Sequence, residues 1–275
     1  RLDLQAIDLD RDGHGLARWQ GWVVVVPGLL PGERASVQLQ QRQKSRWLSR
    51  SSERLTSSPE RRRPPCILAH DCGGCTLQHL EETAQRDWKQ DQLRQTLLRI
   101  GEIEHPQAPV QTDPRGLGYR NRGRIPLRRG EDGRLRMGYF RRGSHRIVNL
   151  SRCPVLDPRL DALVEPLKRD LDGSGLAADH DLSQSQGLRH LGLRMGHHTG
   201  EVLITLVSSH PLPGLKRLAQ QWIQRWDPVK GVTLNLQPRR TNQILGSTTT
   251  VLAGDPTIRE QFCGLELQLS TTTFF

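Results

Sequence analysis

The chain has 275 residues, enough for two or three domains, and its 40 Lys and Arg against 29 Asp and Glu give a net charge of +11. No apolar stretch reaches the roughly 18 residues of a membrane span, and the charged start RLDLQAIDLD excludes a signal peptide. Five cysteines, an odd number, do not suggest a disulfide framework, so we expect a cytoplasmic protein in a reducing setting. We also expect a monomer. Because it starts at Arg1 and stops directly after an apolar strand, we expect a segment of a longer protein.

The positive charge is clustered. Residues 42–63 carry eight basic and two acidic side chains, and residues 115–152 carry twelve Arg against Glu131 and Asp132. Arg binds phosphate through its planar fork and stacks on bases. The clusters favour a nucleic-acid binder, with a solvated surface as the plainer explanation. The low aromatic content, 4%, means that stacking platforms are few.

Residues 1–56 are predicted to form a small β-barrel. Trp22–Val26 is an apolar strand, Pro27–Gly32 is a Pro/Gly turn, and Arg34–Gln40 alternates like a half-buried strand. Short strands separated by such turns are typical of barrels. The Ser-, Arg- and Pro-rich stretch 51–65 indicates a linker, and we place the domain boundary at 57–65.

The remainder, 66–270, is predicted to be a mixed domain of the α+β class with several antiparallel hairpins. Helices are expected at 81–100, 157–171 and 215–226. Strands are expected at 119–127, 134–140, 188–195, 201–207, 231–237, 242–247 and 264–270.

Three cysteines, Cys66, Cys72 and Cys75, follow a C-x5-C-x2-C spacing, and Cys153 precedes a proline. Four thiolates around one centre are typical of structural zinc and of [4Fe-4S] clusters. Zinc ribbons use two C-x2-C pairs, so the split of three plus one favours the cluster. The adjacent Gly73 and Gly74 would let the backbone wrap closely around it.

Other interpretations of these cysteines stay open. The CGGC segment is also the spacing of a thioredoxin-like dithiol, although no βαβ pattern surrounds it. Zinc held by the same cysteines, or with His70 or His79 as a ligand, is a second alternative, and unliganded thiols are a third. We expect Cys263 to be a small buried residue on a strand.

Several blocks of the sequence resemble a known family in the order in which they occur. These blocks are CILAHDCGGCTLQHL followed by Trp88-Lys89, YRNRGRIPL, SHRIVNLSRCPVL, LRHLGLR, GEVLITLV and LNLQPRRTNQILG. Together they resemble the bacterial S-adenosylmethionine-dependent RNA uracil-5-methyltransferases, specifically the 23S rRNA branch that carries an iron–sulfur cluster. Residues 1–56, most tellingly GWVVVVPGLLPGE, are similar to that family's TRAM domain, an OB-like RNA-binding barrel.

The resemblance implies a [4Fe-4S] cluster on Cys66, Cys72, Cys75 and Cys153. It also implies that residues 271–275 begin a Rossmann-like methyltransferase domain that lies outside this chain. That domain would supply the S-adenosylmethionine pocket, the cysteine that adds to uracil C6 and the glutamate base. No catalytic or S-adenosylmethionine-binding residue is therefore expected here, and this chain alone is expected to be inactive.

The expected role of these 275 residues is to bind RNA. The resemblance to the family implies that this RNA is 23S rRNA. The RNA contacts we expect are Arg120, Arg122 and Arg124, which alternate along one predicted strand and would share one face. The alternative is that this face of the strand is simply solvated. Phe274 matches the family position whose ring packs against the target base. Weaker candidates for phosphate or RNA contacts are Arg61, Arg62, Arg63, Arg141, Arg142, Arg239 and Arg240.

Two further classes of function are alternatives. The first is a stand-alone, metal-stabilised RNA-binding module without enzymatic activity. The second, an iron–sulfur redox protein, is disfavoured because no second redox or cofactor motif is visible. Uracil methylation by this route needs no electron transfer, so we expect the cluster to hold residues 66–75 against the strand end at Cys153.

Overall fold

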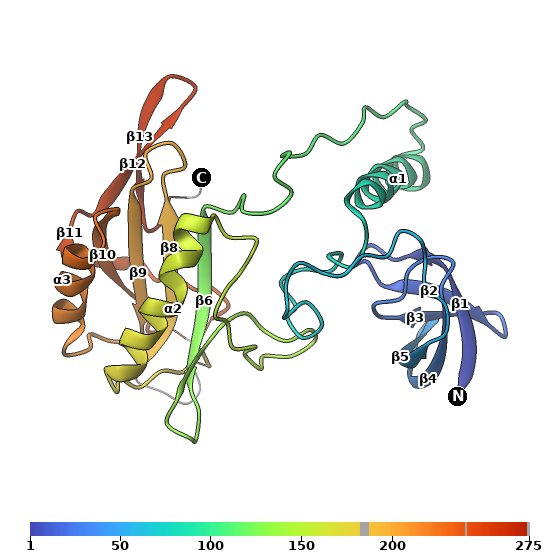
Figure 1. Ribbon diagram of the computed structural model, residues 1–275, viewed down its shortest axis with the longest axis horizontal. Helices are drawn as coiled ribbons and strands as arrows, with labels where there is room; N and C mark the ends of the chain where they lie inside the picture. Colours follow the sequence, from blue (N-terminus) through green and yellow to red (C-terminus); the bar gives the residue numbers. More distant parts are fainter. Residues whose placement is uncertain (182–186, 240, 274–275) are drawn as a thin grey trace. The chain divides into compact units, whose positions relative to one another are not determined.

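The computed structural model describes residues 1–181, 187–239 and 241–273, which fall into two compact units (Figure 1). The first unit comprises residues 1–70 and 74–114, and the second comprises Asp71–Gly73 and the chain from Arg115 onward. This division differs from the predicted boundary at 57–65, which lies inside the first unit. None of the helices in these described ranges is long and apolar enough to span a membrane.

The first unit is built on a closed five-stranded barrel, which confirms the prediction for residues 1–56. Its strands are β1 (Leu2–Leu9), β2 (Gly15–Trp19), β3 (Trp22–Val26), β4 (Arg34–Gln43) and β5 (Arg46–Arg54). They close in the order β1-β2-β3-β5-β4, with β3 and β5 parallel. Alternating small apolar side chains fill the interior: Leu4, Ala6, Ala17, Val24, Val26, Leu29, Ala35 and Val37.

The stretch predicted to be a linker is part of this unit. Residues 51–54 belong to β5, and Arg61 reaches back to the fully buried carboxylate of Glu33. The two Arg61–Glu33 hydrogen bonds measure 2.5 and 2.7 Å, and the backbone N–H groups of Leu30 and Ser58 also donate to Glu33. Arg61 therefore fixes the segment to the barrel, and its assignment as a phosphate contact was wrong.

Helix α1 (Glu82–Gly101) confirms the helix predicted at 81–100. Its first turns pack through Ala84 and Trp88 onto barrel residues Leu9 and Leu30. Arg62 donates to Glu82 at 3.1 Å and to the Gln78 carbonyl, so this arginine is also engaged within the unit.

The second unit contains a six-stranded sheet in the order β11-β10-β9-β8-β6-β7. Its strands are β6 (Arg122–Arg129), β7 (Leu135–Met137), β8 (Leu188–Met195), β9 (Val202–Ser208), β10 (Val229–Leu236) and β11 (Thr248–Gly254). All neighbours are antiparallel except β9 and β10, which helix α3 (Leu215–Arg225) connects as a βαβ unit. A separate hairpin, β12 (Thr257–Phe262) and β13 (Leu265–Ser270), follows.

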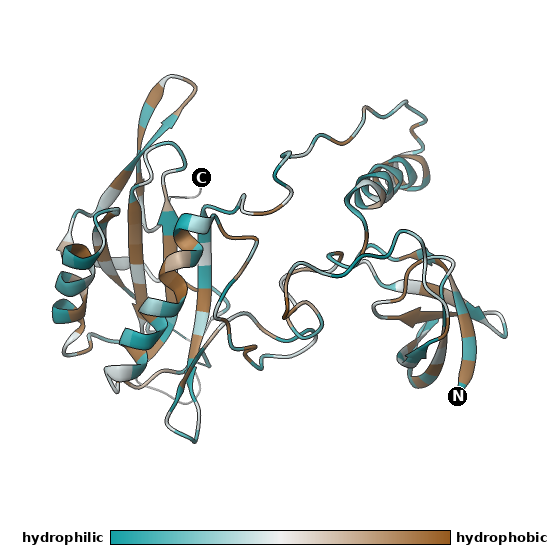
Figure 2. Ribbon diagram, viewed as in Figure 1, coloured by the Kyte–Doolittle hydropathy of each residue, from teal (hydrophilic) through white to brown (hydrophobic). Residues whose placement is uncertain are grey.

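The two helices of this unit pack on strands of the sheet. Helix α2 (Pro158–Gly173) contacts β7 and β8, and α3 contacts β10 and β11 (Figure 1). The Asp157 carboxylate accepts the Arg159 N–H at 3.0 Å and caps α2, as expected for a helix that starts with Pro158. The apolar colour along β9 in Figure 2 matches a strand buried on both sides.

Three details differ from the sequence prediction. Residues 242–247 form no strand, because the side-chain amides of Asn235 and Gln237 bond the backbone of Gln243, Leu245 and Gly246 instead of a ladder partner. Strands β11 and β12 were not predicted. Cys263 is exposed, with φ of 50° in the turn between β12 and β13, so its placement as a buried strand residue was wrong.

Candidate nucleic-acid interface

One face of the large sheet is polar where the other is apolar. The register places Arg122 opposite Arg194 and Arg124 opposite Gly192, and continues through Thr205 on β9 to Thr233 on β10. Because side chains alternate along strands, these positions share one face. We call it the polar sheet face and define it by Arg122, Arg124, His190, Arg194, Thr205, Thr233 and Asn235.

The opposite face supplies the core. Ile125 and Leu127 of β6, with Leu191 and Leu193 of β8, alternate with the polar positions and are buried. Their counterparts on the helices are also buried: Leu160, Leu163, Val164, Leu167 and Leu171 of α2, and Leu215, Leu218, Ala219 and Trp222 of α3. The helices therefore account for the apolar face and leave the polar one for another role.

Arginines crowd the β6–β8 part of the polar sheet face. Arg194 is 5% exposed, and burial, followed by the neighbouring charges of Arg122 and Arg124, lowers its pKa to about 10. Burial and the charge of Arg122 also lower the pKa of Arg124. Arg124 makes no ion pair with any described residue. Like charges brought together in this way are favourable sites for an anion such as a phosphate.

Three threonines order the middle of the same face. The hydroxyls of Thr205, Thr233 and Thr271 bond one another at 2.9–3.1 Å. Thr271 follows β13, whose Leu269 packs with Ile258 on Leu203. The hairpin and the residues after it thereby cover part of the polar sheet face, up to Arg194, whose register partner is Leu203 and whose guanidinium donates to the Thr273 carbonyl.

A cavity of about 700 Å³ lies in the same unit. Phe140, His145, His180, Arg189 and His190 contribute to its wall, and Asn242 and Gln243 come from the segment that follows β10. His190 and Ile244 line both this cavity and a small space beside Arg122 and Arg124. We call it the histidine cavity. The sequence did not predict a site at its three histidines and Arg189, although Arg189 and His190 lie within the LRHLGLR segment.

His190 gives a pH test of this arrangement. Burial, followed by the charges of His180, Arg189 and Arg124, lowers its pKa to about 4. The unfolded chain then binds more protons between pH 6.5 and 4, so acidification through this window should lower the free energy of unfolding by up to about 3 kcal/mol. Urea unfolding followed by tryptophan fluorescence measures this slope. The His190→Gln variant should flatten it, and an identical slope in both proteins would contradict the assignment.

The predicted RNA-contacting arginines are only partly brought together. Arg122 and Arg124 share β6, whereas the exposed Arg120 precedes the strand and pairs through its backbone with Leu156 and its neighbours. Arg120 therefore does not continue the alternation. Phe274 and Arg240 lie outside the described residues.

Arg141 is held by the short segment that contains Cys72. The Asp71 carboxylate accepts from Arg141 at 2.7 Å, and Cys72 pairs with Arg141 through the backbone. The Gly73 N–H donates to the Phe140 carbonyl at 2.8 Å, and a Cβ on Gly73 would lie 3.0 Å from that oxygen. Gly73 therefore permits a close approach to the Phe140 backbone, whereas the predicted wrapping of Gly73 and Gly74 around a cluster stays a prediction. Arg142, next in the chain, is partly buried.

None of the four predicted ligand cysteines, all of which lie in the described residues, forms a disulfide. Cys72 and Cys153 belong to the second unit, and Cys66 and Cys75 to the first. The two thiols of the second unit both affect the pKa of Tyr139. Burial raises the pKa of Tyr139 to about 12, and Cys153 and Cys72 contribute in the same direction. The Cys153 N–H donates to the Asp161 carboxylate at 2.6 Å, which fixes the turn that precedes α2.

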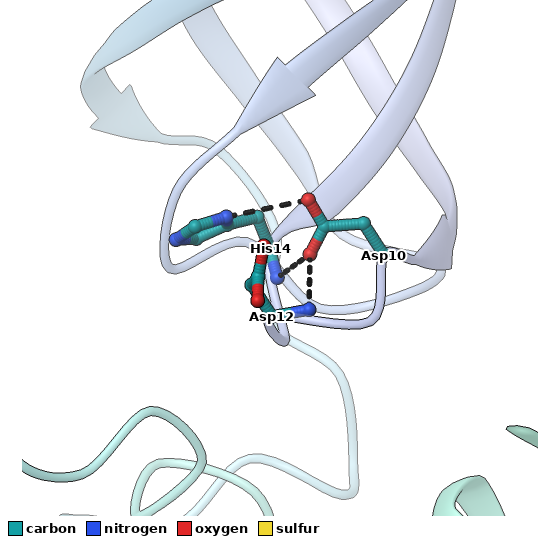
Figure 3. Close-up of side chains that lie close together, drawn as sticks. All are labelled: Asp10, Asp12 and His14. Atoms are coloured by element: carbon teal, nitrogen blue, oxygen red, sulfur yellow. Dashed lines mark hydrogen bonds and ion pairs between the residues drawn. The ribbon is translucent and has the colours of Figure 1, made fainter.

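A second group with metal-ligating side chains lies in the β1–β2 turn of the barrel (Figure 3). Asp10 accepts from the backbone N–H groups of Asp12 and His14 at 3.0 and 2.8 Å, and its other oxygen is 3.3 Å from His14 Nδ1. These bonds are those of an Asx-type turn around Gly13 and account for the group without a metal.

Comparison with known proteins shows similarity along the entire chain. An uncharacterized RNA methyltransferase of Parasynechococcus marenigrum is 88% identical over 275 residues, which are 100% of this chain and 59% of that protein. Another from Synechocystis is 41% identical and one from Bacillus cereus is 32% identical, each covering 100% of this chain and 60% of the relative. The chain thus spans about three fifths of the length of these relatives. No protein-family model matches it.

A solved structure is similar as well. The tRNA (uracil-54, C5)-methyltransferase of Pyrococcus abyssi, in complex with S-adenosyl-L-homocysteine, matches with a TM-score of 0.72 and 25% identity. The match covers 99% of this chain and 60% of that one. The succession of a closed barrel and a mixed sheet therefore also occurs in a chain that is longer than this one.

Proposed function

We propose that this chain is the RNA-binding part of an S-adenosylmethionine-dependent methyltransferase that makes 5-methyluridine in RNA, with 23S rRNA as its substrate. The polar sheet face carries the proposal: a sheet whose one side is closed by α2 and α3 presents the half-buried Arg122 and Arg124 on the other, beside the buried Arg194. RNA methyltransferases similar along the whole chain agree with it.

In this proposal residues 1–56 are an RNA-binding TRAM barrel, and 66–270 are a second RNA-binding region. Residues 271–275 begin the domain that holds S-adenosylmethionine, which supplies the methyl group. The contribution of this chain is to bind the RNA and to present the unstacked uridine. Arginines at β6 would hold the phosphates around it, because backbone contacts fix register and orientation.

The experiment is methyl transfer by the full-length protein from labelled S-adenosylmethionine, with nucleoside analysis of the product. We expect 5-methyluridine in 23S rRNA and none in transfer RNA, each prepared without modifications. Label in transfer RNA only would correct the substrate class. Label in neither RNA, with RNA binding intact, would favour a binding module instead.

We further propose that Cys66, Cys72, Cys75 and Cys153 hold a [4Fe-4S] cluster. Four cysteine thiols are the donor set that such a cluster needs, and two of them, Cys72 and Cys153, both contribute to the raised pKa of Tyr139. Its role would be structural, with Cys72 already fixed against Arg141 through the backbone.

Metal analysis tests the ligand set. Anaerobically purified protein should contain about four iron and four sulfide per chain, and replacing any one of the four cysteines by serine should remove most of both. The Cys263→Ser variant is the matched control, because that thiol is exposed in the β12–β13 turn, and it should keep the full content. Stoichiometric zinc without sulfide would contradict the cluster.

A further inference from the structure

The histidine cavity holds buried polar atoms that make no hydrogen bond within the described protein, although His180 Nδ1 lies 4.0 Å from an Asp179 carboxylate oxygen. His180 Nδ1, Arg189 Nε and His190 Nδ1 are buried and make no hydrogen bond with any described group. All three residues line the cavity. Arg189 is 3% exposed and the His180 side chain is 8% exposed. Native structures satisfy such groups, so their collection at one cavity indicates a ligand that would bond them.

The cavity also has an aromatic wall. The Phe140 ring lies 4.9 Å from the His180 ring and 5.5 Å from the His145 ring, centroid to centroid. Flat rings in a partly closed space are the surface on which proteins stack unpaired bases. The volume of about 700 Å³ lies within the about 300–1,000 Å³ usual for ligand sites.

The hydrogen-bonding groups suit a base edge better than a phosphate. Because its pKa is near 4, His190 is a neutral imidazole at neutral pH, with one donor and one acceptor nitrogen. Arg189 already donates through one terminal nitrogen to the Gln237 carbonyl, which leaves its buried Nε as a directional donor. Mixed donors and acceptors beside the Phe140 ring match the edge and face of a nucleobase.

We propose that the histidine cavity binds an unstacked nucleobase of the RNA, with its ring against Phe140 and its edge on His190 and Arg189. This inference rests on the proposed function, since it assigns a base-reading site to the same RNA. The neighbouring polar sheet face would hold the adjoining phosphates, because His190 borders both the cavity and the space beside Arg122 and Arg124. The site would thus join base recognition to backbone binding.

The first test uses the 275-residue chain and histidine-ring resonances in NMR. The probes are uridine, cytidine, adenosine and guanosine 5′-monophosphates, with ribose 5-phosphate and inorganic phosphate as base-free controls. Saturable shifts of the His180 and His190 signals with at least one mononucleotide, and none with the controls, are expected. Equal shifts with ribose 5-phosphate would reassign the cavity to phosphate. No shift with any mononucleotide up to its solubility limit would overturn the proposal.

The second test uses the full-length protein and the RNA that it methylates, with single abasic positions introduced one at a time. One abasic position should weaken wild-type binding by about tenfold. The same position should cost nothing in the Phe140→Leu and His190→Gln variants. If the protein methylates RNA but the abasic position weakens binding equally in wild type and in both variants, the cavity inference fails while the proposed function stands. If no RNA is methylated, the function fails, and the mononucleotide titration alone decides the cavity.

Discussion

Replacing Arg122 and Arg124 together by alanine is expected to weaken RNA binding by the full-length protein by roughly 100-fold. Each arginine that contacts a phosphate or a base contributes about 1–3 kcal/mol, and tenfold in affinity corresponds to about 1.4 kcal/mol. Both side chains lie on the polar sheet face, and Arg124 has no ion pair with a described residue that would compete for it. Fluorescence anisotropy with labelled RNA measures the change.

The matched control removes the same charge from the other side of the sheet. Lys216 and Arg217 are exposed on α3, whose buried residues pack towards β10 and β11. Their double alanine variant should bind RNA within about threefold of wild type, because screened charges away from the interface contribute little. The Arg122/Arg124 variant should also reduce the slope of log affinity against log salt by about two. Equal losses in the two double variants would show that only net charge matters.

Replacing Glu33 by alanine should cost about 3–5 kcal/mol of stability in the first unit, because it leaves Arg61 without its carboxylate in a largely buried place. Glu33 is fully buried and also accepts from Leu30 and Ser58, so three sets of donors lose their acceptor at once. Hydrogen exchange of the amides of β1–β5 reports on this unit alone.

A matched control and a pH measurement accompany this variant. Glu53→Ala, at an exposed position of β5, should change stability by no more than about 0.5 kcal/mol. Hydrogen bonds from Arg61, Leu30 and Ser58 outweigh burial and lower the pKa of Glu33. The stabilisation is therefore present above the ordinary carboxylate range and is lost as the pH falls through the folded pKa. Barrel exchange rates unchanged in Glu33→Ala would disprove the structural role of the pair.

Local patterns in the sequence predicted most of the elements. The apolar run Trp22–Val26 and the alternation after Arg34 specify barrel strands, and Pro158 with Asp157 specifies the start of α2. Each signal lies within one turn or one strand, where side-chain spacing and backbone restriction act directly. The strand predicted at 242–247 is absent because the Asn235 and Gln237 side chains bond the backbone of this segment. A contact between two segments leaves no local period in the sequence.

The candidate site was predicted only in part, for the same physical reason. Alternation on β6 placed Arg122 and Arg124 together, but Arg194 joins them through strand register, which depends on pairing across the sheet. The histidine cavity collects His180 and His190 from both sides of a segment that the sequence leaves unpatterned. Arg61 resembled a solvated charge in an Arg run, because its partner Glu33 is 28 residues away.

Photo-crosslinking of 4-thiouridine RNA to the full-length protein tests most directly whether the polar sheet face binds RNA. Mass spectrometry of the digested complex locates each crosslink on the chain. We predict crosslinked peptides from β6 and β8, around Arg122, Arg124 and Arg194, that disappear in the Arg122/Arg124 double variant. Crosslinks confined to α2 and α3, on the other side of the sheet, would contradict the account.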